Sequence, residues 1–279
     1  MPKKKKTIQE LTAMKSRGEK TATAICYDYQ WAKLVNETEI ETILCGDSLG
    51  MNVYGYDSTN PVTMEQMIVH CQAVRKGAPD TFVFGDMVYG SYQACVEDAV
   101  RNGIRLVKET GVDAVKLEGG AEFAPHVKAM TAAGIVVFGH LGLTPQSTAA
   151  IGGFKTQGRD IKSGRKIIQD AIALYEAGAK AILLETVPQI LGEFISKKLP
   201  IVILAYDAIG TLLCDMFGMT PGKIPRFAYR SKYVFSDLIL ETLNAFHKDV
   251  AAECFPKEEN MYTVKGSEEE YMKLFDEFE

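Results

Sequence analysis

The chain has 279 residues, of which 47% are hydrophobic and 24% charged. This much apolar surface can offset the entropy lost on ordering the chain, so the composition indicates a globular protein and excludes an intrinsically disordered one. The 31 lysines and arginines against 36 aspartates and glutamates give a formal net charge of −5, which argues against nucleic acid as the main partner. No run approaches the ~18 consecutive apolar residues of a membrane span, so we expect no membrane partner.

Residues 1–20 begin with a basic tip, four lysines at positions 3–6, and continue into an expected lead-in helix. No apolar segment follows the lysines, so we expect a solvated end rather than a secretory signal. Several of the six cysteines lie in apolar runs, which predicts free buried thiols in a reducing, cytoplasmic compartment. None has the spacing of a C-x-x-C pair or of a metal finger; they stand at positions 26, 45, 71, 95, 214 and 254.

Short apolar runs alternate along the chain with longer stretches of helical periodicity. Such runs are typical of parallel strands that are covered on both faces. They occupy residues 23–27, 42–45, 81–84, 114–117, 135–138, 181–184 and 201–205, with a weaker eighth run at 211–214.

The stretches between these runs have apolar residues at helical spacing, most clearly in residues 92–109, 121–132 and 167–177. Gly111, Gly134 and Gly178 follow these or similar stretches, at positions where a helix end needs a residue of positive φ. The alternation predicts an α/β fold, a closed (β/α)₈ barrel of the TIM type in one domain over residues 1–279. An open, doubly wound sheet is the alternative.

Two segments depart from this alternation. Residues 142–160 contain several glycines and predict a long loop after the fifth strand, and loops of that length are usually functional or disordered. Residues 266–279 form an acidic, amphipathic C-terminal tail that we expect to be a surface helix.

Acidic residues stand at the carboxyl ends of several predicted strands. They are Asp47 after the second strand, Asp86 after the third, Glu118 after the fourth and Glu185 after the sixth. In a barrel these ends share one face, where active sites are built. Carboxylates that lie so close together repel one another unless a cation neutralises them or one of them holds a proton. A set of ligands made only of oxygen atoms favours a hard ion such as Mg²⁺. For any single residue, Asp47 with Ser48 above all, helix capping is the alternative role.

Lys116 lies two residues before Glu118, so both side chains point to the same side of the fourth strand. In a barrel mouth this lysine would hold a substrate carboxylate; the alternative is a structural ion pair with Glu118 or Asp86. His140 ends the fifth strand. A lone histidine at such a position is more often a hydrogen-bonded structural residue than a ligand or a base.

Nine consecutive residues, 139–147, read Gly-His-Leu-Gly-Leu-Thr-Pro-Gln-Ser and form a distinctive motif. Further motifs occupy residues 27–29, 46–51, 57–59, 61–63, 116–120, 152–154, 157–159, 184–185 and 187–188. Together they resemble the ketopantoate hydroxymethyltransferase family, in order over residues 7–200 and again near 215–227.

The resemblance implies a barrel of the phosphoenolpyruvate mutase/isocitrate lyase superfamily type and an Mg-dependent hydroxymethyltransferase of pantothenate biosynthesis. In that reaction 5,10-methylenetetrahydrofolate gives a hydroxymethyl group to C3 of 3-methyl-2-oxobutanoate, through an Mg-stabilised enolate, and ketopantoate forms. The resemblance also implies a homo-oligomer, often a decamer.

The resemblance assigns roles to the residues at the strand ends. Asp47 and Asp86 would bind Mg²⁺, with Glu118 as a further ligand, directly or through water. The 2-oxo acid would be bound by Asp47, Ser48, Asp86 and Lys116. Glu185 would be the catalytic proton acceptor, with His140 as a supporting residue.

Residues 203–215 depart from the family pattern. The glycine-rich strand is shorter here, and Cys214 replaces a histidine. Ile203 and Tyr206 replace small residues, which predicts either a narrower pocket that prefers a smaller 2-oxo acid or an altered folate site. Two rival functions remain: a metal-dependent carbon–carbon lyase or aldolase acting on another 2-oxo acid, and a non-catalytic barrel with a binding or assembly role.

Overall fold

The computed structural model describes residues 3–220, 222 and 224–278. The chain divides into two compact units, Met1–Met216 with Thr220–Arg230, and Phe217–Met219 with Ser231–Glu279. All eight strands lie in the first unit. The expectation of one domain over residues 1–279 stays a prediction.

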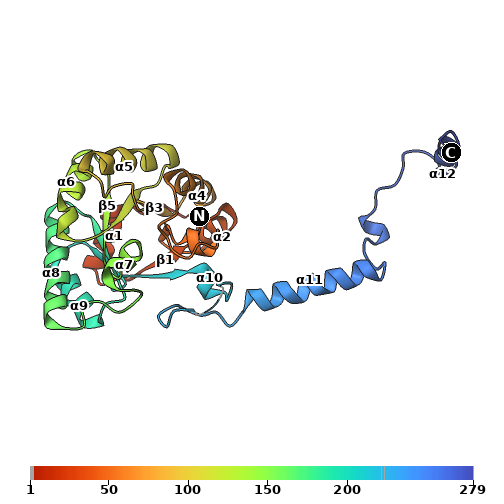
Figure 1. Cartoon of the computed structure of the whole chain (residues 1–279). Helices are drawn as coiled ribbons and strands as arrows, with labels where there is room; N and C mark the ends of the chain where they lie inside the picture. The colour runs from red at the N-terminus through yellow and green to blue at the C-terminus, as the bar shows by residue number, and fades with distance from the viewer. Residues whose placement is uncertain (1–2, 221, 223, 279) are drawn as a thin grey trace. The chain divides into compact units, whose positions relative to one another are not determined.

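The first unit is built on a closed barrel of parallel strands in which each strand pairs with the next and β8 pairs with β1 (Figure 1). The predicted (β/α)₈ barrel is therefore confirmed, and the open sheet is wrong. The strands are β1 Thr21–Ile25, β2 Thr42–Cys45, β3 Phe82–Asp86, β4 Ala114–Glu118, β5 Val137–Gly142, β6 Ala181–Glu185, β7 Val202–Leu204 and β8 Ala208–Leu212.

Apolar side chains fill the interior of the barrel. β2, β3 and β4 are buried along their whole length, as continuous apolar runs predict. The rings of Phe84 and Phe138 pack with their centroids 4.8 Å apart. Helix α1, Ile8–Ser16, adds Leu11 and Met14 to this core, and Lys15 on the same helix donates to carbonyls just before β7. Because α1 thus covers the amino ends of the strands, the carboxyl ends remain for a site.

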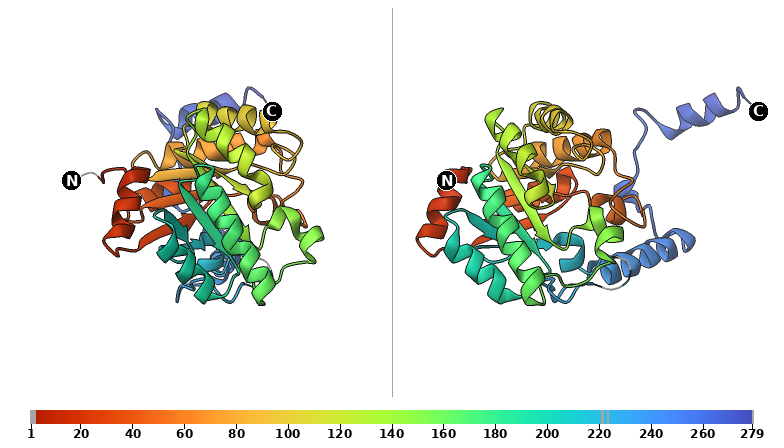
Figure 2. Two further views of the ribbon diagram at one scale, coloured as in Figure 1. Left: turned by 90° about the vertical axis from the view of Figure 1, so that its left-hand side faces the viewer. Right: turned by 60° about the vertical axis from the view of Figure 1, so that its left-hand side comes forward.

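Helices flank the barrel, as two further views show (Figure 2). The predicted helical stretches correspond to α5, α6 and α8, and the three predicted terminal glycines have φ values of 74°, 85° and 106°. The helices of this unit after α1 are α2 Tyr29–Asn36, α3 Leu49–Asn52, α4 Met64–Gly77, α5 Val96–Thr110, α6 Ala124–Ala132, α7 Thr148–Ile151, α8 Ile161–Glu176, α9 Gln189–Lys198 and α10 Leu213–Met216, with the 3₁₀ turn Ala121–Phe123 before α6.

The predicted long loop at residues 142–160 contains regular structure, so that prediction is wrong in part. A 3₁₀ turn, Pro145–Ser147, leads directly into α7. Pro145 favours a helix start because its φ is already helical and its missing N–H costs nothing there. Gly152, with a φ of 79°, ends α7.

The connection from β7 to β8 has no helix. Ala205 has a φ of 77°, and the carboxylate of Asp207 accepts hydrogen bonds from Ile203 N at 2.9 Å and Ser196 Oγ at 2.7 Å. The chain therefore turns back at once and β8 begins at Ala208. The predicted eighth strand at 211–214 is wrong in its position, because residues from Leu213 onward form α10.

The predicted narrowing of the pocket by Ile203 and Tyr206 is also wrong. Val202 and Leu204 belong to the barrel core, so Ile203 between them points outward. The Tyr206 ring lies under Lys20, whose Nζ is 4.3 Å from the ring centroid, and Lys20 immediately precedes β1. Neither side chain reaches the carboxyl ends of the strands.

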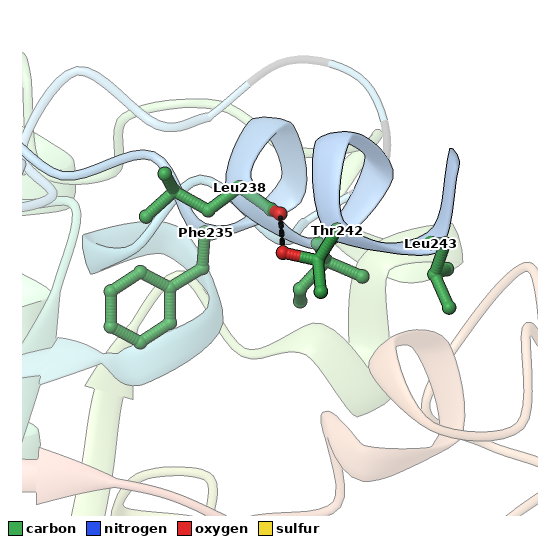
Figure 3. A pocket seen from close by; sticks show the side chains of 5 residues that line it. Phe235, Leu238, Thr242 and Leu243 are labelled. Atoms are coloured by element: carbon green, nitrogen blue, oxygen red, sulfur yellow. Dashed lines mark hydrogen bonds between the residues drawn. The ribbon is translucent and has the colours of Figure 1, made fainter. Parts of the chain in front are cut away.

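The second unit contains α11 Phe235–Ala251 and α12 Glu268–Phe275, with the 3₁₀ turn Glu258–Asn260 between them. Helix α12 confirms the surface helix predicted in the acidic tail. None of the described residues of α11 is buried, and five of them line a small hollow (Figure 3): Phe235, Leu238, Ile239, Thr242 and Leu243. In the described part of the chain, no helix is both long enough and apolar enough to span a membrane.

Candidate active site

The strand-end residues singled out in the sequence lie together at the carboxyl end of the barrel. Lys116 pairs in register with Asp86, and Glu118 pairs with His140. Glu185 pairs with Gly142 of β5. Because side chains two residues apart share a face of a strand, Lys116 and Glu118 both point into the barrel mouth.

Asp47 and Asp86 form a contiguous buried pair. Asp86 Oδ2 accepts a hydrogen bond from Asp47 N at 3.0 Å, and Asp86 Oδ1 lies 2.9 Å from Lys116 Nζ. The second contact is a buried ion pair. Both carboxylates are almost fully shielded from solvent, with 3% and 2% exposure. A Cβ at position 46 would lie 3.2 Å from Asp86 Oδ2, which is why glycine suits this position.

The acidic residues outnumber the cations in this site. Burial, together with repulsion from Asp86 and Glu118, raises the pKa of Asp47 well above its usual range. Burial also raises the pKa of Asp86, although Lys116 opposes this rise. Burial would lower the pKa of Lys116, but attraction to Asp86, Glu118 and Asp47 outweighs it and raises that pKa. Lys116 is therefore charged, and the negative charge that it leaves uncompensated is offset either by a bound cation or by a proton on a carboxylate such as Asp47.

His140 bridges two acids. Its Nδ1 lies 3.2 Å from Glu118 Oε1, and its Nε2 lies 3.2 Å from Glu185 Oε2. Burial and Lys116 lower the pKa of His140, but its bonds to Glu118 and Glu185 outweigh them and raise it. Burial likewise opposes ionisation of Glu118, yet His140, Lys116 and the backbone of Gln146 lower its pKa. Its Nδ1 also lies 3.2 Å from Lys116 Nζ, a group that can only donate, and its Nε2 makes no hydrogen bond within the described residues, so the contacts of His140 with the two acids are ion-pair contacts.

For Ser48, the structure does not show the helix-capping role that was the alternative to a role in the site. Ser48 is the N-cap residue directly before α3 but makes no side-chain capping bond. Its Oγ lies 2.8 Å from Tyr27 Oη, and Asn52 Nδ2 also donates to that phenol oxygen at 3.3 Å. The Ser48 hydroxyl is thus held at the barrel mouth by a residue that follows β1.

Sequence reasoning gave no role to Tyr27 or Gln146. Like the carboxylates, Tyr27 is a polar residue at the carboxyl end of a predicted strand, residues 23–27, but it lacks their charge. Gln146 is 3% exposed and donates to Asp47 Oδ2 from Nε2 at 2.8 Å, and its backbone N donates to Glu118 Oε2 at 2.9 Å. A neutral amide in a loop carries no comparable signal.

The donor set fits a hard divalent cation. Asp47 and Asp86 supply carboxylate oxygens, whereas across residues 3–220, 222 and 224–278 no three His, Cys, Asp or Glu side chains are gathered as a complete metal-binding group. Mg²⁺ is commonly bound through one or two carboxylates, with water and substrate completing its shell. Two buried acids with excess negative charge meet that need.

Fold and site together define a class of protein, a (β/α)₈-barrel enzyme with buried acids, a lysine and a histidine at the carboxyl ends of its strands. A family model described as ketopantoate hydroxymethyltransferase matches residues 5–258. The chain belongs to this family and is a transferase. The comparisons do not support the lyase or the non-catalytic alternative.

Relatives named 3-methyl-2-oxobutanoate hydroxymethyltransferase match nearly the whole chain. A 3-methyl-2-oxobutanoate hydroxymethyltransferase from Alkaliphilus metalliredigens is 45% identical over 99% of this chain and 99% of its own length. One from Heliobacterium modesticaldum is 42% identical over 98% of this chain and 99% of its own.

Solved structures share the fold at low sequence identity. 2,3-Dimethylmalate lyase, described as a PEP mutase/isocitrate lyase superfamily member, has a TM-score of 0.56 at 16% identity and covers 98% of this chain and 99% of its own. A phosphonopyruvate hydrolase in complex with oxalate and Mg²⁺ has a TM-score of 0.57 at 14% identity, over 98% and 96%. These likenesses confirm the barrel fold.

Proposed function

We propose that this enzyme transfers a hydroxymethyl group from 5,10-methylenetetrahydrofolate to C3 of 3-methyl-2-oxobutanoate and so forms ketopantoate for pantothenate biosynthesis. Membership of the family supports this reaction, and one observation connects the reaction with particular residues of this chain. Glu185 has 28% of its side chain exposed and lies against His140, at the edge of a site whose other acids are buried. An acid is thus within reach of a substrate that the buried groups hold.

Asp47 and Asp86 would hold Mg²⁺, and Lys116 and Ser48 would hold the 2-oxo acid. Bound Mg²⁺ supplies positive charge to the carboxylate and keto oxygens of the substrate, which makes the C3 proton more acidic. The Lys116 ammonium group, charged and nearly inaccessible to water, balances the substrate carboxylate.

Glu118 already bonds His140 through Oε1 and the backbone N–H of Gln146 through Oε2. Both oxygens are therefore engaged by the protein. Glu118 would serve as a further metal ligand directly or through a water molecule, and the water-mediated form would leave both contacts in place.

Glu185 would take the proton from C3, and His140 would orient it. The 3.2 Å ion-pair contact between His140 Nε2 and Glu185 Oε2 places the imidazole beside one carboxylate oxygen, and the other oxygen would accept the proton. The carbon so activated would form a bond to the one-carbon unit of the folate; the two C–N bonds of that unit would break, water would supply the hydroxyl oxygen, and tetrahydrofolate would leave.

We further propose a homo-oligomer, possibly decameric in the family's manner, working in the cytoplasm. The exposed apolar residues of α11 support self-association, because large apolar surfaces on soluble proteins usually mark interfaces.

Proton NMR tests the proposed function directly. We expect the C3 proton of 3-methyl-2-oxobutanoate to exchange in D₂O with enzyme and Mg²⁺, and ketopantoate to appear once methylenetetrahydrofolate is added. The absence of both exchange and product with Mg²⁺ present would refute the proposal. Exchange without product would locate the failure on the folate side.

A further inference from the structure

Gln146 lies where three strand ends meet, and every hydrogen-bonding position of its side-chain amide is used. Nε2 donates to Asp47 Oδ2 and to the carbonyl of Met87, both at 2.8 Å. Oε1 accepts from Tyr92 Oη at 2.8 Å and from Gln93 Nε2 at 3.1 Å. Two donors and two acceptor positions are all that a primary amide has.

These partners fix the orientation of the amide. The carbonyl of Met87 can only accept, so the group that faces it must be the NH₂ of Gln146. Gln93 in turn accepts from Gly90 N at 2.7 Å through its Oε1, which leaves its own NH₂ to face Gln146 Oε1. A flipped Gln146 would set acceptor against acceptor and donor against donor. Asp47 Oδ2 therefore receives an N–H.

This contact leaves the two oxygens of Asp47 unequal. Oδ2 is bonded to Gln146, whereas no donor in the described part of the chain is bonded to Oδ1. The backbone N–H of Asp47 bonds Asp86, so the main chain on that side is also fixed. Asp47 consequently presents one oxygen in one direction.

We propose that Gln146 is a positioning residue for the divalent cation: it holds Oδ2 of Asp47 so that Oδ1 alone is presented to the metal. The inference rests on the proposed function, since it takes Asp47 as a metal ligand. Groups that orient metal ligands in this way typically contribute 10–100-fold to metal affinity.

Removing the amide frees the Asp47 carboxylate to rotate and leaves the Met87 carbonyl without its partner. Gln146→Met keeps the length of the side chain but cannot donate. Gln157→Met is the matched control, because Gln157 lies in the same connection after β5 and, among the described residues, its side-chain amide donates to Lys155 O alone, at 3.0 Å.

Titration calorimetry with MgCl₂ alone tests the proposal on the full chain. We expect Gln146→Met to bind Mg²⁺ at least about tenfold more weakly than the wild type, and Gln157→Met to bind it unchanged. Thermal melts report folding separately. A Gln146→Met protein that is less stable but binds Mg²⁺ with wild-type affinity would overturn the proposal, because it would show a structural role only.

A second variant covers the case in which Gln146→Met does not fold. Gln146→Asn keeps a neutral amide but is one methylene too short to reach both Asp47 and Met87, so the same loss of Mg²⁺ affinity is expected. Wild-type affinity in this variant would equally overturn the proposal. A wild-type chain that does not bind Mg²⁺ at all would instead refute the proposed function, so the two failures are distinguishable.

Discussion

Asp47 and Asp86 lie in one buried site, where Asp47 has one oxygen, and Asp86 has both, beside a protein donor or cation. Their remaining negative charge is costly in so shielded a place unless a proton or a cation offsets it. This is a local property of the residues, which is why the acids at the strand ends could be selected from the sequence. The barrel topology brought them together as the strand-end rule predicts.

We expect Asp47→Asn and Asp86→Asn each to weaken Mg²⁺ binding at least tenfold and to lower turnover, without unfolding the protein. The amide keeps the shape of the side chain but removes the anionic oxygen that a hard cation needs. Titration calorimetry measures the affinity, and circular dichroism checks the fold. Unchanged affinity in either variant would remove that residue from the metal site.

Glu185→Gln should retain Mg²⁺ and 2-oxo acid binding but lose C3 proton exchange by at least about 100-fold, because a neutral amide cannot accept the proton. NMR exchange in D₂O gives the rate. Glu193→Gln is the control, since Glu193 is an exposed acid of α9 that pairs only with Lys197 among the described residues. Exchange at the wild-type rate in Glu185→Gln would exclude Glu185 as the base.

At the scale of the element, prediction succeeded where a strand is specified by its own residues. β2 and β4 begin at the predicted residues because an unbroken apolar run is a local signal. The turn between β7 and β8 is held by contacts with residues far away in sequence. Lys15 Nζ lies 2.9 Å from Asp207 Oδ2, across most of the chain, so no local pattern could show where β8 begins.

Helix α11 was not among the helices that we predicted from the sequence. Its apolar residues Leu238, Thr242 with its methyl group, and Leu243 recur at helical spacing, so periodicity could have predicted a helix. Periodicity could not have predicted that the described residues of this helix are all unburied. That depends on what the rest of the chain leaves for the helix to pack against.

Asp207→Ala should destabilise the first unit by about 3 kcal/mol, because it leaves Lys15 without its partner in a largely shielded place and frees the N–H of Ile203. Urea denaturation measures the free energy of unfolding. Lys197→Met breaks an exposed pair on α9 and should leave the free energy of unfolding nearly unchanged, because solvent screens such a pair. Equal effects of the two substitutions would show that Asp207 does not hold the turn.

At the scale of the whole molecule, the barrel and the exposed C-terminal helix differ in how far they bury their apolar side chains. The barrel covers its core, and the residues proposed for its site lie between positions 47 and 185. On α11, by contrast, Leu238, Ile239 and Leu243 are 50%, 44% and 57% exposed. Apolar side chains gathered on one helix favour association in water, because covering them releases the free energy of their hydration.

We therefore expect the chain to sediment as an assembly larger than its 30.7 kDa mass, and the double variant Leu238→Asp, Leu243→Asp to move it toward the monomer. Burying two carboxylates in an apolar interface costs several kcal/mol, so the association constant should fall by more than about 100-fold. Asn244→Asp is the control, because it adds a carboxylate to the same helix in place of a polar side chain. Light scattering gives the mass. If the double variant assembles like the wild type, α11 does not form the interface; if Asn244→Asp dissociates as well, added negative charge rather than lost apolar contact is the cause.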